Sequence, residues 1–282
     1  MNGPGRTGNL GVQLWAVAVV AAQSALLLLA MMLAFGPIAW AAARLGAPQG
    51  YALNLLYPVA LYLLLAAAHR WLTGLRPSAG GFSLRSLPVH LCLGLVLGAA
   101  AVLGILGLTA LWRPSLGLAL SSQAAAPGAL AVLLADVVET GFAEEFLVRG
   151  FMLPALIRRG IQPQTAALIS VLLFALAHFQ VQPIWWLLPI AATGLFLSYL
   201  YYATASIWAP VGCHLAINLV FGLVNRGILL QAPGPGDHLA DIAAVECVVF
   251  LTLAALAALW HQRRVAAGAS DFPLPRMQVE HT

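Results

Sequence analysis

Between residues 144 and 218, apolar sequence contains six side chains whose types and spacing suit acid–base chemistry at one site. They are two adjacent acids, an arginine, two histidines and an amide: Glu144, Glu145, Arg149, His178, His214 and Asn218. An ionisable side chain at the centre of a membrane-spanning helix costs about 2.5–3.5 kcal/mol. Residues retained there against that penalty are candidates for a functional site.

The spacing of the first three residues predicts different roles for the two acids. Glu145 and Arg149 are four residues apart, so on a helix they share a face and can form an ion pair. We expect this pair to orient its helix and to neutralise Arg149. Glu144 points about 100° away around the helix, which leaves it free to serve another helix as a general base.

The two histidines extend this chemistry to other helices. His214 and Asn218 are four residues apart and should project from one face, and Phe174 should pack on His178 in the same way. An imidazole beside a glutamate can share the activation of a water, whereas an imidazole and an amide can donate to an oxyanion. Such a set suffices for water-driven acyl transfer without a serine or cysteine nucleophile.

A metal site is the alternative reading of the same residues. Glu144, His178 and His214 could bind zinc with a water in the fourth position. The sequence lacks HExxH, the spacing that places two zinc ligands and a base on one helix. We therefore favour a metal-free mechanism without a cofactor, in which the Glu144 carboxylate is the base.

The composition indicates that these residues lie in a polytopic membrane protein. Hydrophobic residues make up 62% of the 282 residues and charged residues only 8%, compared with about 25% in soluble domains. The arginines stand at the ends of apolar stretches rather than in a patch, which argues against nucleic-acid binding. The apolar stretches predict about eight transmembrane helices, near residues 13–35, 51–68, 88–111, 128–157, 165–181, 186–203, 205–225 and 239–261.

The predicted helices bring the polar residues to similar depths. Counted at 1.5 Å per residue from the ends of their spans, Glu144 and His178 lie roughly 21 Å deep. On the same scale His214 lies at roughly 12 Å and Asn218 at roughly 18 Å. A cavity between helices would gather polar groups in this way, so we expect an all-α fold that encloses an intramembrane cavity.

Arginine counts predict the orientation of the chain in the cell (inner) membrane. With eight crossings, Arg6, Arg70, Arg76, Arg85, Arg158, Arg159, Arg263, Arg264 and Arg276 fall on one side, and Arg44, Arg113 and Arg226 on the other. The positive-inside rule then places both termini in the cytoplasm. We expect a single transmembrane domain over residues 1–262, with a catalytic core at about 128–225, and a mobile cytoplasmic tail at 263–282.

Three motifs in this core resemble those of the CPBP intramembrane proteases, which include the type II CAAX prenyl endopeptidases and lysostaphin-resistance-A-like proteins. EExxxR corresponds to residues 144–149, FxxxH to residues 174–178 and HxxxN to residues 214–218. Many members have phenylalanine immediately before the motif arginine, where this sequence has Val148. The resemblance covers only this middle part of the chain.

The resemblance implies an intramembrane endopeptidase that cleaves a membrane-embedded or lipidated peptide or protein in the lipid bilayer. Glu144 and His178 would activate water, and His214 and Asn218 would stabilise the oxyanion. Some members act as scaffolds or immunity proteins. A non-proteolytic scaffold, or a transporter whose polar cluster binds a proton or a ligand, therefore remains the alternative.

Overall fold

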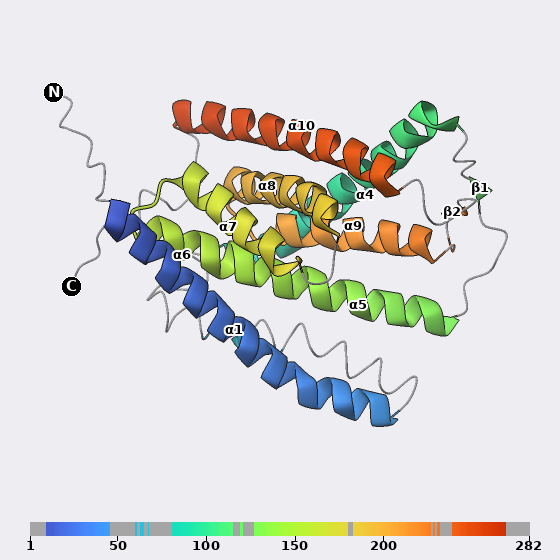
Figure 1. Cartoon of the computed structure of the whole chain (residues 1–282), viewed down its shortest axis with the longest axis horizontal. Coiled ribbons are helices and arrows are strands. Elements are labelled where there is room, and N and C mark those ends of the chain that lie inside the picture. The colour runs from blue at the N-terminus through green and yellow to red at the C-terminus, as the bar shows by residue number, and fades with distance from the viewer. Residues whose placement is uncertain are drawn as a thin grey trace.

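The computed structural model is a bundle of helices (Figure 1). It describes residues 10–45, 60, 63–64, 67, 81–114, 119–120, 127–179, 183–226, 228, 230–231 and 239–268. The α-helices are α1 (Leu10–Leu45), α4 (Leu87–Trp112), α5 (Pro127–Glu145), α6 (Leu153–Arg158), α7 (Pro163–Ala177), α8 (Leu187–Thr204), α9 (Trp208–Asn225) and α10 (Leu239–Ala266). A π-helical segment, η3 (Phe146–Met152), joins α5 to α6, and a short 3-10 helix, η4 (Ile184–Trp186), precedes α8.

The chain is a multi-pass membrane protein, as its composition predicted. Within the part of the chain that the structure describes, five segments are long and apolar enough to cross a bilayer: Leu10–Ala30, Leu87–Trp112, Ile184–Thr204, Trp208–Asn225 and Ala240–Ala266. Helices also cover the predicted span 128–157 and residues 165–177 of the predicted span 165–181, because the 15-residue helix α7 ends at Ala177. The predicted span 51–68 lies mostly outside the described residues, so the count of eight crossings stays a prediction.

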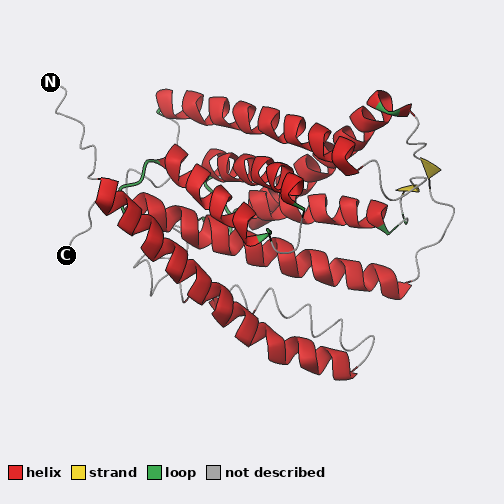
Figure 2. Ribbon diagram, viewed as in Figure 1, coloured by secondary structure: helices red, strands yellow, loops and turns green. Residues whose placement is uncertain are grey.

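Two local features differ from the sequence prediction. The first span was predicted to end near residue 35, but α1 continues through Gly36 and Pro37 to Leu45. Such helix breakers are tolerated in transmembrane helices because the freed backbone groups find other partners. In addition, β1 (Ala119–Leu120) pairs antiparallel with β2 (Leu230–Gln231), which adds a small strand pair to the predicted all-α fold (Figure 2).

Helix α9, which contains His214 and Asn218, lies against both α4 and α5. Helix α8 packs against α7 on one side and α10 on another. In Figure 1 α1, α7 and α9 run from left to right, whereas α5, α8 and α10 run back in the opposite direction. The resulting antiparallel arrangement lets residues on α5, α7 and α9 meet in the middle of the bundle.

Glycines bring the backbones of α4 and α9 into direct contact. A Cβ added to Gly94 would collide with the carbonyl of Ala209 and the amide of Cys213, and one on Gly212 would collide with the carbonyl of Leu91. Small residues at transmembrane interfaces permit this close approach. The packing of α4 therefore fixes the position of α9 and, with it, the position of His214.

We expect Gly94→Ala to lower the free energy of unfolding by at least about 1–3 kcal/mol, because the new methyl group must push backbone apart. Gly104→Ala is the matched control, since Gly104 lies on the same helix with nothing within 4 Å of its added Cβ. This control should be neutral or stabilising by up to about 1 kcal/mol, because alanine is the better helix former. The free energy of unfolding of each purified variant is measured in detergent. Equal values for Gly94→Ala and Gly104→Ala would contradict the prediction.

An aromatic cluster ties the π-helical segment to the start of α9. The Phe146 ring lies 5.1 Å from the Phe82 ring and 5.9 Å from the Trp208 ring, both edge-on. The indole nitrogen of Trp208 donates to the carbonyl of Ser83 at 2.9 Å. These contacts hold the segment that follows Glu145 rigidly against the helix that contains His214.

Candidate active site

The acidic pair stands where the α-helix changes to a π-helix. Glu144 and Glu145 are the last residues of α5, and Leu153 donates its backbone N–H to Val148, five residues earlier, at the end of η3. In a regular α-helix the Pro154 ring would collide with the carbonyl of Gly150, and the wider π turn relieves this collision. Isolated π turns of this kind are frequent at functional sites.

Glu145 joins two other helical segments at the centre of the site. Its Oε1 accepts hydrogen bonds from Nη1 of Arg149 and from Nδ1 of His214, each at 2.8 Å. The other terminal nitrogen of Arg149 donates to the carbonyl of Gly194 on α8. The side chains of Glu145 and Arg149 are fully buried. The predicted Glu145–Arg149 ion pair is therefore present, and it also holds α8 and α9.

The hydrogen-bond partners of the histidines assign their tautomers. Nδ1 of His214 faces the Glu145 carboxylate, and Nδ1 of His178 lies 2.9 Å from the carbonyl of Phe174. Both partners accept hydrogen bonds only, so Nδ1 is the protonated nitrogen in each ring. The Phe174 ring also packs edge-on against the His178 ring, with 4.5 Å between ring centroids, as the spacing predicted.

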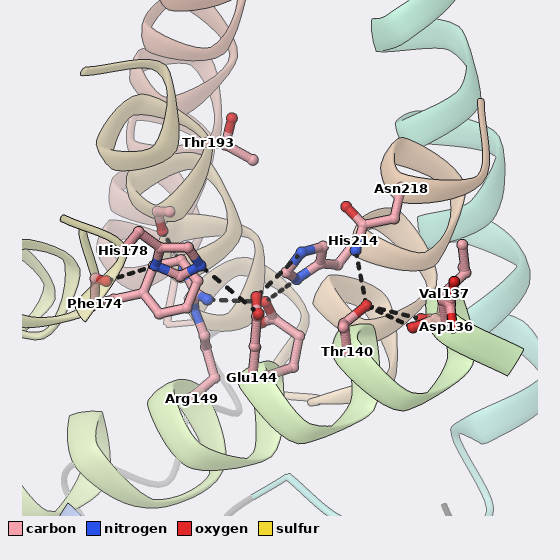
Figure 3. A network of polar contacts seen from close by, with 12 residues as sticks. Asp136, Val137, Thr140, Glu144, Arg149, Phe174, His178, Thr193, His214 and Asn218 are labelled. Carbon is pink, nitrogen blue, oxygen red and sulfur yellow. Dashed lines mark hydrogen bonds and ion pairs between the residues drawn. The ribbon is translucent and has the colours of Figure 1, made fainter. Parts of the chain in front are cut away.

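Glu144 lies between the remaining nitrogens of the two histidines (Figure 3). Its Oε1 is 3.8 Å from Nε2 of His178, and its Oε2 is 3.5 Å from Nε2 of His214. These separations exceed a direct hydrogen bond, and a water can bond to the carboxylate and an imidazole together. The arrangement places one carboxylate and two imidazoles from α5, α9 and the end of α7 around a common point.

Asn218 lies one helical turn beyond His214 and is held by a different contact. Its amide nitrogen donates to the hydroxyl of Thr140 at 3.2 Å, and that hydroxyl donates to the carbonyl of Asp136 at 2.8 Å (Figure 3). An amide has two N–H donors, so one remains for a ligand. Asp136 itself forms an ion pair with Arg226 at 3.1 Å, which joins α5 to the end of α9.

A pocket of about 520 Å³ opens onto these residues. Its lining includes Glu144, His178, His214 and Asn218 together with apolar side chains such as Leu197 and Phe221. This volume is typical of sites that bind small molecules or short peptide segments. In the described part of the chain, no group of three or more His, Cys, Asp or Glu side chains is arranged to hold a metal ion.

Sequence reasoning missed several contacts that build the site. Thr140 precedes Glu144 by four residues and shares its helix face, so the helical spacing could have identified it. Glu246 lines the same pocket from α10, and the rule that flagged Glu144 as an ionisable residue in an apolar span applies to it as well. The carbonyl of Gly194 gave no signal in the sequence, because every residue has one.

Comparison with known proteins supports the resemblance seen in the motifs. Residues 126–220 match the model of the family described as type II CAAX prenyl endopeptidase Rce1-like. The matched segment extends from the beginning of α5 into α9 and contains all three motifs. The predicted resemblance is therefore confirmed over this segment. Neither the curated proteins nor the solved structures contain a match to the chain.

Proposed function

We propose that the protein is an intramembrane endopeptidase that hydrolyses a peptide bond of a membrane-embedded or lipidated substrate. The observation that supports this function most directly is the placement of Glu144 between Nε2 of His178 and Nε2 of His214. The match of residues 126–220 to a family of CAAX-type intramembrane peptidases agrees with it. Glu144, His178, His214 and Asn218 are the proposed catalytic residues.

In the proposed reaction Glu144 and His178 position a water and activate it. The water oxygen attacks the carbonyl carbon of the scissile bond while the Glu144 carboxylate accepts the water proton. The C–N bond of the tetrahedral intermediate then breaks, and Glu144 returns the proton to the leaving nitrogen. The reaction needs no covalent intermediate with the protein, which agrees with the carboxylate as the central group.

His214 and Asn218 are the proposed donors to the oxyanion. The Glu145 carboxylate accepts from Nδ1 of His214, so it stabilises an imidazolium that carries a second proton on Nε2. That Nε2–H and the free N–H of Asn218 would donate to the developing negative charge. Glu145 and Arg149 support the site by fixing His214, and Phe174 fixes His178 through its carbonyl.

The arginine distribution supports a topology with both termini in the cytoplasm. Helix α10 runs to Ala266, just past the proposed boundary between the domain at 1–262 and the tail at 263–282. Residues 269–282 of this tail lie outside the described residues. The proposed catalytic core at about 128–225 comprises α5 to α9.

Reconstitution tests this function directly. The purified full chain in phospholipid vesicles should cut membrane-anchored reporter peptides at a discrete bond, and mass spectrometry of the products identifies that bond. Peptides with a single membrane span and peptides with a C-terminal lipid should be compared. If the double variant Glu144→Ala/His178→Ala retains the biological function of the wild type, the protein acts as a scaffold and the proposal is wrong.

Removal of metal ions is expected to leave the cleavage rate unchanged within about twofold, because the proposed base is a carboxylate. The test is needed, since metal-binding histidines also donate their second N–H to a carboxylate or carbonyl, as His178 and His214 do here. Metal analysis of the purified protein and the rate after dialysis against a chelator provide the measurement. Stoichiometric zinc together with chelator-abolished activity would contradict the metal-free mechanism.

A further inference from the structure

Glu246 on α10 is a buried acid in the same pocket that the proposed reaction does not use. Only 7% of the residue is exposed, and its side chain lines the pocket beside residues of α8 and α9. Its Oε1 accepts a hydrogen bond from the hydroxyl of Thr193 at 3.3 Å. Its Oε2 has no hydrogen-bond partner in the described structure. A buried carboxylate oxygen without a partner carries a desolvation penalty that a ligand can offset.

The pocket contains two other carboxyl groups, and each of these faces nitrogen. Asp136 pairs with Arg226, and Glu144 lies between two imidazoles. Glu246 contacts a neutral hydroxyl instead, although the cost of burying a carboxylate is lowest when a cation or several donors accompany it. Among the acids of the pocket, Glu246 is the one that faces no nitrogen and has a buried oxygen without a partner.

The position of Thr193 relates this acid to the proposed catalytic residues. Thr193 is adjacent in sequence to Gly194, whose carbonyl accepts from Arg149. Figure 3 shows Thr193 apart from the α5 residues, with the two histidines between them. A substrate segment in the pocket could therefore reach Glu144 with its scissile bond while a neighbouring side chain points toward α10.

We propose that Glu246 is a specificity-determining residue that binds a cationic side chain, lysine or arginine, of the substrate near the scissile bond. The free Oε2 would accept a charge-assisted hydrogen bond from the ammonium or guanidinium group. The surrounding apolar lining, including Leu197 and Ile242, would pack on the aliphatic stem of that side chain. This inference rests on the proposed peptidase function, because it concerns the substrate of the same site.

Binding and cleavage of matched peptides test the inference. The probes are fluorescent membrane-anchored peptides with one lysine scanned through the residues around the cut, each compared with the same peptide carrying methionine there. Binding is measured with the full-length Glu144→Gln protein in vesicles, so that cleavage is slow compared with binding. We expect lysine at one position to tighten binding roughly 10- to 100-fold over methionine, as for a desolvated charge pair.

Glu246→Gln is introduced into the same Glu144→Gln protein. The lysine and methionine peptides should then bind with affinities that differ by no more than about threefold, since the amide has no charge. Its carbonyl still accepts from Thr193, so the contact between α8 and α10 and the unfolding temperature should be retained. Asp241→Asn is the control, because Asp241 lies on the same helix, is paired with Arg113 and is not part of the pocket lining. This variant should keep the full preference.

The outcomes separate this inference from the proposed function. If Glu246→Gln keeps the lysine preference, or if no position shows one in the parent protein, the role of Glu246 is refuted, whatever the cleavage activity. If wild type binds the lysine peptides selectively through Glu246 but cuts none of them, the binding role stands and the peptidase function fails. In a cleaving wild type, the preference should appear in KM rather than in kcat, because the cation is bound in both the ground and transition states.

Discussion

Glu144→Gln is expected to lower the cleavage rate by roughly 10²- to 10⁴-fold, the range typical for the loss of a general base. Glutamine has nearly the same size and keeps a hydrogen-bond acceptor, but it does not take up the proton of the attacking water. The side chain lies 3.5–3.8 Å from its histidine neighbours and is partly exposed to the pocket, so we expect the fold to tolerate the loss of its charge. The rate in vesicles and the unfolding temperature in detergent together provide the measurement.

Asp136→Asn is the matched control for this substitution. Asp136 lies on the same helix and lines the same pocket, but it pairs with Arg226 at a position where its side chain is 56% exposed. An exposed ion pair contributes about 0–1 kcal/mol, so stability and rate should change little. A Glu144→Gln protein that cuts reporter peptides at the wild-type rate would rule out Glu144 as the base.

The second large effect concerns folding rather than catalysis. Glu145→Ala or Arg149→Met alone should lower the free energy of unfolding by about 3–5 kcal/mol, because each leaves a fully buried charge without its partner. The Glu145 substitution also removes the acceptor for Nδ1 of His214, so the residual folded protein should be inactive. The Glu145→Ala/Arg149→Met double variant should lose less stability than the sum of the single variants.

The Arg113–Asp241 pair serves as a control for this double-mutant cycle. Its nitrogen and oxygen are 3.1 Å apart, but the Arg113 side chain is 51% exposed. Arg113→Met and Asp241→Asn should each cost no more than about 1 kcal/mol, with a coupling energy of similar size. Additive effects at Glu145 and Arg149 would contradict the view that these two charges stabilise each other in the bundle.

The sequence predicted the contacts that occur within one helix. The spacing of Glu145 and Arg149 and that of Phe174 and His178 specify neighbours on a helix face, and the structure contains both pairs. Contacts between helices were harder to predict from the sequence, because a shared depth in the membrane does not fix how one helix is rotated relative to another. The bond from His214 to Glu145 depends on that rotation and was not predicted.

Helix boundaries show the same limit. The first span was predicted to end near residue 35, just ahead of Pro37, which lacks the backbone N–H that a continuing helix needs. The structure shows that α1 continues through it, and that the π turn occurs ahead of Pro154 instead. Local sequence identifies where a helix is weakened. Whether the helix bends, widens or ends at that position depends on the helices that pack against it.

The glycine contacts between α4 and α9 are reciprocal, and they fix how far α9 is displaced along α4. Gly94 and Gly98 of α4 admit the backbone of α9, while Gly212 of α9 admits the backbone of α4. Sliding one helix along the other by a single residue, about 1.5 Å, would move side chains into spaces that only hydrogen atoms fit. The axial register of α9 is thus locked by protein contacts. Because α9 is held at a fixed height on α4, we expect a thicker or thinner bilayer to tilt these two helices together and to leave the height of His214 relative to α4 unchanged.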